Sequence, residues 1–315
     1  MGVACKRVGR PHAGSGGRNS RRHKGNHAAR AAVILALGLA LLRPGPTPAD
    51  PFLKLRSDPL RATSSRSARL DALESIPFDR LTPEAQAKVS SVLSDISFFR
   101  RMPIQVTQCD PDLYLFLVEH PDVVVNIWEV MGVTQMSIEQ TGPTTFRVTD
   151  TAGTQGAFEY LYSNHGTHLI YTEGAYDGPL FTRQVKGRGL MLLKTGYVRE
   201  PDGRYYITSR LDAFMRVDNV GVELLTKAFS PLVGKVADIN FTQSTGFLGS
   251  LSRSAEVNPD GVGRLAGRLV KVPPESQQEL AQLAGQVADK AAQLAEHDAT
   301  RPPLVATQPT DDRSR

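Results

Sequence analysis

AFEYLYSNHGTHLIYTE, residues 157–173, carries the clearest structural signal in the sequence. On both sides of Asn164-His165-Gly166, aromatic or aliphatic residues alternate with polar ones, and the tripeptide itself is typical of a tight turn. Alternation with a period of two indicates strands that bury one face and expose the other. The segment is therefore predicted to form a β-hairpin with strands at 157–163 and 167–173.

The same period continues in both directions along the chain, from residue 134 to residue 217. Turn sequences rich in Gly, Pro, Asn and Asp divide it into segments of strand length. A bulge is expected around Gly187 and Gly189, inside the longest segment. We expect a meander of six strands, at 134–140, 144–150, 157–163, 167–173, 180–198 and 204–217.

Helical patterns precede and follow the strands. Thr82-Pro83-Glu84 starts an amphipathic helix that is expected to end before Pro103, and 104–107 is predicted to be extended. Asp110-Pro111 opens two short helices, which are separated at His120-Pro121 and stop at Gly132. After the strands, apolar residues at helical spacing predict a long helix from Asp218 or Asn219 to about Leu251, with a kink at Pro231.

This order of elements is similar to the helix-grip fold of the START-like (SRPBCC) superfamily. The resemblance covers residues 103–251, and His120-Pro121 to Trp128 lies where polyketide-cyclase-like members have their helix-entry segment. It implies an α+β fold in which a curved antiparallel sheet of six to seven strands wraps around the long C-terminal helix. Two short helices would close one end. The chain also resembles exported bacterial proteins, which bears on its location alone.

The first 49 residues have the three parts of a secretion signal. A basic stretch reaches Arg30, an apolar run occupies 31–42, and Thr47-Pro48-Ala49 follows a Pro-Gly-Pro sequence. We expect cleavage after Ala49 and export to the periplasm or the extracellular space. Twelve apolar residues are fewer than the roughly twenty that span a bilayer. The weaker alternative is an uncleaved signal that tethers the protein, and membrane contact is expected only through this segment.

The net charge of the whole chain reflects this leader. Residues 1–49 hold nine of the 37 Lys and Arg residues and no Asp or Glu, which leaves 28 basic and 32 acidic residues behind. An acidic mature protein argues against a nucleic-acid partner. Cys109 is the single cysteine beyond the leader, so an internal disulfide is excluded.

The remainder of the chain is predicted to contain one domain. Residues 50–80 are rich in Ser, Arg and Pro and are interpreted as a flexible linker, and 81–255 as the helix-grip domain. Residues 256–315 are expected to be a helical and disordered tail. Within it, 275–297 has apolar residues at heptad-like spacing, but Lys290 stands where the pattern needs an apolar residue.

The usual catalytic and cofactor motifs are absent from the sequence, so we expect no cofactor and no catalytic residues of those classes. His165 and His168 are the best candidates for metal ligands. Residues three apart on a strand face opposite sides, so no metal site is predicted. Arg210, Asp212 and Arg216 form either a solvent-facing ladder or a buried pair that would anchor the acidic head of a ligand.

Aromatic residues on the strands suggest a cavity between the sheet and the long helix. Phe158, Tyr160 and Tyr162 are expected on one face of one strand, and tyrosine suits an amphipathic ligand because its apolar ring has a polar tip. Packing of the same residues against the long helix explains the pattern equally well. The predicted cavity residues are Phe158, Tyr160, Tyr162, Tyr171, Tyr206, Leu225, Phe229 and Val233.

Three functions fit these observations. The first is an exported, non-enzymatic protein of the cell envelope that binds a lipid-like or aromatic small molecule in this cavity. The second is a structural or adaptor protein whose core is filled by its own side chains. The third is a cofactor-free enzyme, a hydrolase or a cyclase-like activity, and an acid buried beside a Tyr or His in the cavity would favour it.

Overall fold

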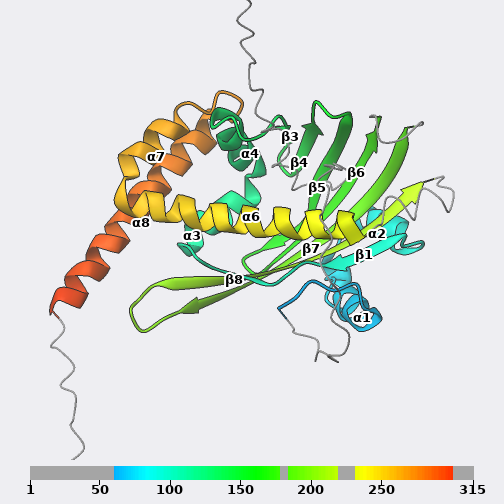
Figure 1. The fold of residues 1–315 in the computed structure, drawn as a ribbon, viewed down its shortest axis with the longest axis horizontal. Helices are drawn as coiled ribbons and strands as arrows, with labels where there is room; N and C mark the ends of the chain where they lie inside the picture. The colour runs from blue at the N-terminus through cyan, green and yellow to red at the C-terminus, as the bar shows by residue number, and fades with distance from the viewer. Residues whose placement is uncertain (1–59, 178–183, 219–230, 301–315) are drawn as a thin grey trace, which may run out of the picture.

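The computed structural model describes residues 60–177, 184–218 and 231–300 (Figure 1). The predicted signal at 1–49 lies outside these residues, as do the predicted cavity residues Leu225 and Phe229. Within the described part of the chain, no helix is both long enough and apolar enough to cross a membrane.

The described strands form one antiparallel sheet in the order β1-β8-β7-β6-β5-β4-β3, and β2 also pairs with β8. The predicted hairpin at 157–173 is confirmed, with Asn164 paired to Thr167 at its turn. The strands are β1 (Phe98–Arg101), β2 (Gln105–Gln108), β3 (Ser137–Gly142), β4 (Thr145–Thr149), β5 (Thr154–Asn164), β6 (Thr167–Tyr176), β7 (Val185–Arg199) and β8 (Tyr205–Asp218).

The end of the first predicted helix and the predicted bulge in the longest strand were both wrong. The first helix ends at Leu93, and Phe98–Arg101 forms β1, an edge strand paired with β8. The bulge expected near Gly187 does not occur, because β7 keeps an unbroken register with both neighbours. Gly187 instead allows close strand approach: a Cβ there would lie 3.1 Å from the Arg216 carbonyl oxygen.

The long helix α6 (Pro231–Val257) lies across one face of the sheet, here called the inner face (Figure 1). Its Ala237 and Phe241 pack with Leu193 of β7 and with Leu211 and Ala213 of β8. Before β3, the short helices α3 (Pro111–Glu119) and α4 (Pro121–Val130) close one end, as expected. Sheet, long helix and closing helices together form an α+β, helix-grip arrangement.

The opposite, outer face of the sheet is covered by residues that the sequence analysis assigned in part to a flexible linker. There α1 (Arg66–Glu74), the 3₁₀ turn η1 (Phe78–Arg80) and α2 (Pro83–Leu93) pack on strand residues that include Leu190 and Phe214. Arg101 of β1 donates to Asp212 at 2.6 Å and to Asp71 of α1 at 2.6 Å. The interpretation of 50–80 as a linker was therefore wrong for the described residues 60–80.

The C-terminal helices also belong to the core, which corrects the predicted domain end at residue 255. Helices α7 (Pro259–Ala266) and α8 (Pro274–Thr300) bury Leu280 and Val287 against α3, α4 and α6. Lys290, which interrupts the heptad pattern, donates at 2.8 Å to both Asp110 and Asp112. The tail forms helices because it has a packed partner, which a short heptad pattern alone does not provide.

Candidate functional site

Aromatic and aliphatic side chains line the inner face of the sheet between β3 and β7. Phe146 of β4 and Phe158 of β5 stack with ring centroids 4.8 Å apart, and Tyr160 meets both rings edge-on. Val125 and Trp128 of α4 pack on the same group. Phe158 and Tyr160 thus lie on the face predicted for them, within an apolar wall.

At the end of this wall, polar side chains converge from the α3–α4 junction and from β5 and β6. His168 Nε2 lies 3.4 Å from Glu119 Oε1, and the His168 ring meets the Tyr160 ring edge-on at 6.2 Å between centroids. The Tyr160 hydroxyl donates to the Val118 carbonyl oxygen near the end of α3. His120-Pro121 breaks the helix here, which brings Glu119 and Asp122 to the same corner.

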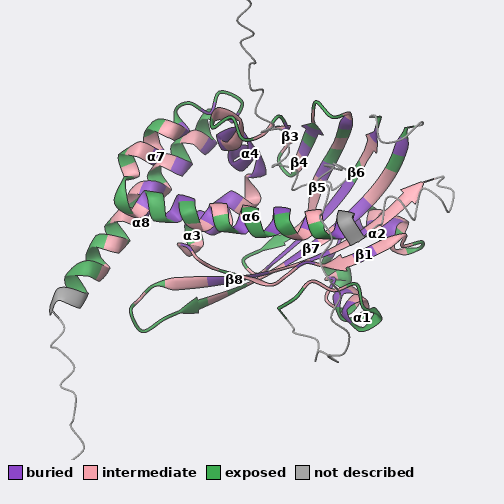
Figure 2. Cartoon of the chain, in the orientation of Figure 1, coloured by how far each residue is buried: buried purple, intermediate pink, exposed green. Residues whose placement is uncertain are grey.

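Several buried polar atoms in this region have no hydrogen-bond partner within the described residues. They are both carboxylate oxygens of Asp122, Nδ1 of His168 and Oδ1 of Asn126. Asp122 and His168 are fully buried, and Figure 2 shows α4 buried over most of its length. Buried polar groups are nearly always paired, so these atoms require water or a bound group as partner.

Burial also shifts the pKa values of these groups. Loss of hydration raises the pKa of Asp122, although the nearby His120 and the backbone N–H groups of Asp122 and Val123 partly offset this effect. Loss of hydration also lowers the pKa of His168, and the nearby Glu119 carboxylate partly offsets that effect. The pKa of Tyr160 is raised by burial and by the charges of Glu119 and Asp122. Burial thus disfavours the charged forms of the carboxyl group, the imidazole and the phenol. We call Glu119, Asp122, Tyr160 and His168 the inner polar cluster.

The inner polar cluster has access to solvent at one point, because the Glu119 side chain is 40% exposed. Its members provide hydrogen-bond donors and acceptors beside an apolar wall, which is the composition of a small-molecule site. The described residues contain no group of three or more His, Cys, Asp or Glu side chains placed to hold a metal ion. The exposed ring of His165 does not join His168, because it packs on the Tyr197 ring with 4.1 Å between the ring centroids.

Tyr162 does not share a face with Phe158 and Tyr160, contrary to the sequence-based expectation. A register shift between Tyr160 and Tyr162 marks a bulge in β5. The extra residue reverses the alternation, so the Tyr162 hydroxyl lies on the outer face and accepts from Arg80 of η1 at 3.2 Å.

The other predicted cavity residues are distributed over the molecule. Tyr171 packs under α2 on the outer face, and its hydroxyl donates to Glu173 at 3.0 Å. Tyr206 lines a separate outer pocket with Val106 and Val198. Val233 belongs to α6, but its side chain is not described. The structure therefore brings together only Phe158 and Tyr160 among the described members of the set.

The polar residues of β8 also lie on the outer face. Asp212 is fully buried between Arg101 at 2.6 Å and Arg210 at 3.4 Å, and both arginines also reach Asp71 of α1. Arg216 donates to the Ser91 carbonyl oxygen at the end of α2. The buried Arg–Asp pair is therefore present, but it lies on the outer face, where the network fastens the N-terminal helices to the sheet.

The sequence analysis missed Glu119, Asp122 and Asn126 as candidates. Asp122 follows Pro121 in the first turn of a helix, where an acidic residue is usual because it complements the helix dipole. One signal was present: α4 is apolar on almost every side, so a carboxylate within it had to be buried or paired.

Comparison with known proteins adds little to this description. No protein-family model and no curated protein matches the chain. A conserved protein from Geobacillus kaustophilus is similar in structure, with a TM-score of 0.34 and 10% identity over 48% of this chain and 93% of that one. Ara h 8.0201 is similar with a TM-score of 0.27 and 14% sequence identity, over 46% of this chain and 99% of that one. The Mll3558 protein from Rhizobium loti has a TM-score of 0.27 and 13% sequence identity, over 45% of this chain and 95% of that one.

Proposed function

We propose that this protein binds a small amphipathic molecule on the inner face of the sheet. The observation that carries the proposal is the fully buried Asp122 carboxyl group, which has no side-chain hydrogen-bond partner among the described residues and lies close enough to Tyr160 to raise the pKa of that phenol. An unpaired buried carboxyl group costs on the order of 1–3 kcal/mol or more, and a ligand that pairs with it recovers this energy.

The wall next to the inner polar cluster suits the apolar part of such a ligand. Phe158, Tyr160 and Ile170 offer aromatic and aliphatic surface, and Met191 of β7 adds an adaptable side chain. A lipid-like or aromatic body would lie along these residues, with its polar end at Asp122 and His168.

The charges of the inner polar cluster favour a neutral or cationic polar end over an acidic one. Glu119 and Asp122 are acidic, and the lowered pKa of His168, caused by burial, disfavours a compensating positive charge. Arg210, which the sequence analysis considered as an anchor for an acidic head, is paired with Asp71 and Asp212 on the outer face. We therefore expect a hydroxyl, amide or amine at this end of the ligand.

Export is part of the proposal and is supported by the leader sequence at 1–49. A binding protein located outside the cytoplasm would meet envelope lipids or imported small molecules. Amino-terminal sequencing of the protein secreted by its own host should begin at Asp50. Recovery of Met1 or Gly2 would show that the leader is retained and would replace export with a tethered location.

Native mass spectrometry of the protein purified from its own host tests the binding function. We expect a mass above that of the polypeptide, and solvent extraction should recover an amphipathic molecule. Asp122→Asn should reduce its occupancy at least fivefold, since the amide cannot ionise and places an NH₂ group at one of the acceptor positions.

A matched pair of variants makes this test specific. Tyr160→Phe removes a hydroxyl on the inner face, whereas Tyr162→Phe makes the same change two residues away on the outer face. The first should lower occupancy and the second should not. If the wild type carries no molecule, or both variants behave alike, the binding proposal is wrong and a filled structural or adaptor domain becomes the better description.

Acid–base catalysis is a second candidate, favoured by the raised pKa of Asp122 and the lowered pKa of His168 next to Tyr160. A carboxyl group and an imidazole whose charged forms are both disfavoured by burial can act as proton donor and proton acceptor. The recovered molecule distinguishes the two functions. Incubation of that molecule with fresh protein would leave it unchanged under the binding proposal, whereas an enzyme would convert it.

A further inference from the structure

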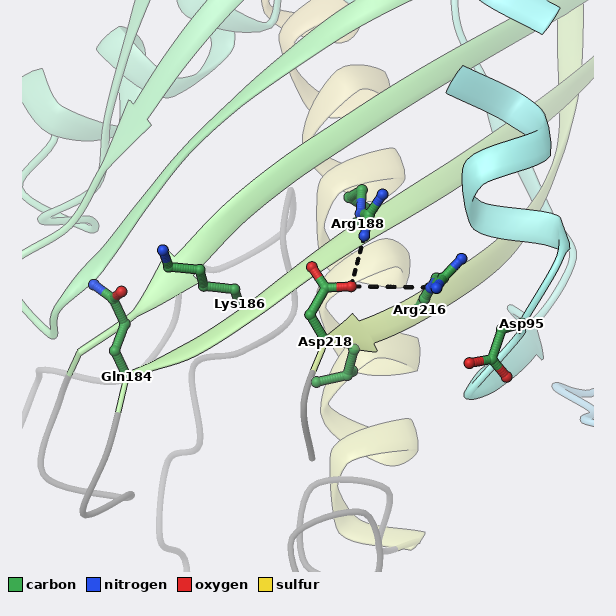
Figure 3. Close-up of a pocket in the computed structure, with 7 residues that line it drawn as sticks. Asp95, Gln184, Lys186, Arg188, Arg216 and Asp218 are labelled. Carbon is green, nitrogen blue, oxygen red and sulfur yellow. Dashed lines mark hydrogen bonds and ion pairs between the residues drawn. The ribbon is translucent and has the colours of Figure 1, made fainter. Parts of the chain in front are cut away.

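A polar pocket opens on the outer face of the sheet, beyond the end of α2 (Figure 3). Its volume of about 720 Å³ is within the range of small-molecule sites. Strands β7 and β8 supply most of the lining, and Asp95 contributes from the segment between α2 and β1. The lining residues are Asp95, Gln184, Lys186, Arg188, Arg216, Val217 and Asp218.

Strand pairing places cationic side chains next to each other in this pocket. Arg188 of β7 is directly opposite Arg216 of β8, and Lys186 is opposite Asp218. All four side chains project on the same face of the sheet. Like charges that face each other across two strands are destabilising, so the pair of arginines requires a compensating negative charge.

Asp218 supplies only part of that compensation. Its carboxylate lies 2.7 Å from Arg188 Nη2 but 3.9 Å from Arg216 Nε, and the side chain of Lys186 points away from it (Figure 3). Asp218 therefore serves the two arginines, Glu173 lies opposite Arg188 across β6–β7, and Lys186 is left as the cation of the pocket without an ion-pair partner among the described residues.

The two guanidinium groups are held in place before any ligand arrives. Arg216 Nη1 donates to the Ser91 carbonyl oxygen and to Ser94 Oγ, both at 2.9 Å, and Asp218 fixes Arg188. Two positioned guanidinium groups beside a flexible lysine are suited to the oxygen atoms of a phosphate group. Asp95, exposed on the rim, is the second carboxylate in the lining.

This concentration of cations is not a consequence of overall charge, because the chain after residue 49 has more acidic than basic residues. We propose that the pocket binds an oxyanion of the phosphate type through Lys186, Arg188 and Arg216. The phosphate group can belong to a soluble phosphate ester or to a phospholipid headgroup. The site is separate from the inner polar cluster, which lies on the opposite face of the sheet.

Calorimetric titration of the full chain with inorganic phosphate and with glycerol 3-phosphate tests the soluble source. We expect saturable binding that Lys186→Gln weakens at least fivefold, and that weakens as salt is raised because the pocket is open. Asp95→Asn should have the opposite effect and tighten binding by about two- to threefold, since it removes a repelling carboxylate. Arg204→Gln is the control, because Arg204 is exposed at the β7–β8 turn and its nearest carboxylate is Asp202 at 3.8 Å.

Co-sedimentation with vesicles tests the headgroup source. Phosphatidylglycerol vesicles should retain the wild-type chain more than Lys186→Gln, and phosphatidylcholine vesicles provide the zwitterionic comparison. A Lys186-dependent response to soluble phosphate assigns the soluble source, and one to vesicles alone assigns the headgroup. The proposal is wrong if neither responds, if Lys186→Gln binds like the wild type, or if Asp95→Asn weakens binding.

Discussion

Tyr160 and Tyr162 are two residues apart on β5, yet their hydroxyl groups lie on opposite faces of the sheet. The bulge between them directs Tyr160 toward Val118 of α3 and Tyr162 toward Arg80 of η1. One irregular position thus allows a single strand to hold the closing helices on one face and the N-terminal segment on the other. Because the two side chains are chemically identical, they provide a direct comparison of the two faces.

Removal of the two hydroxyl groups should have unequal effects on stability. Tyr160→Phe leaves the Val118 carbonyl oxygen without its partner and should lower the free energy of unfolding by about 1–2 kcal/mol. Tyr162→Phe removes an exposed group and should change it by less than about 0.5 kcal/mol. Urea unfolding followed by circular dichroism measures both. Equal losses would contradict the assignment of the two residues to different faces.

The contact of α6 with the sheet predicts a large effect of truncating Phe241. Its ring is 5% exposed and packs with Leu193 and Leu211. Phe241→Ala should lower the free energy of unfolding by about 3–5 kcal/mol. Ile239 lies on the same helix and is 45% exposed, so Ile239→Ala is the control. Its free energy of unfolding should be within about 0.5 kcal/mol of that of the wild type. A small effect at Phe241 would mean that the helix does not grip the sheet at this point.

The packing of α8 predicts that the C-terminal helices are required for stability. A chain that ends at Ala255 would expose the surfaces of α3, α4 and α6 that α8 covers. We expect it to aggregate, or to melt more than about 10 °C below the full chain. Thermal unfolding and size-exclusion chromatography measure the two outcomes. A soluble truncated chain with an unchanged melting temperature would restore the domain boundary predicted from the sequence.

A point variant within α8 separates lost packing from the other effects of truncation. Leu280 is fully buried, and Leu280→Ala should cost about 2–5 kcal/mol. Val270, which is 86% exposed, is the matched apolar control and should tolerate alanine.

Local patterns predicted much of the fold. The strands from β3 to β8 and the junction of α3 with α4 follow from alternation and from Pro-containing helix starts, and these signals are contained in a few neighbouring residues. The bulge in β5 was not predicted: Leu161 between Tyr160 and Tyr162 interrupts the alternation, but three consecutive apolar residues do not show which of them is the extra one. The docking of α8 was missed for another reason. Lys290 disturbs a heptad pattern, and its partners Asp110 and Asp112 are far away in the sequence although they contact it in the fold.

Asp122 predicts a characteristic dependence of stability on pH. Burial raises its pKa in the folded protein above the ordinary value of 3.8. Below pH 3.8 the carboxyl group is protonated in both the folded and the unfolded chain. As the pH rises above 3.8, the unfolded chain ionises first, so the contribution of Asp122 to stability is lost until the raised folded-state pKa is passed.

Asp122→Asn should remove this loss, because an amide does not ionise. The free energy of unfolding of the variant, measured by urea titration between pH 4 and pH 8, should fall less with rising pH than that of the wild type. His168 affects the same measurement with the opposite sign, since its lowered pKa reduces stability as the pH falls below 6.5. The comparison is therefore repeated in a His168→Gln background. Identical pH profiles with and without Asp122 in that background would show that the carboxyl group is hydrated, and would remove the observation on which the inner-face binding site depends.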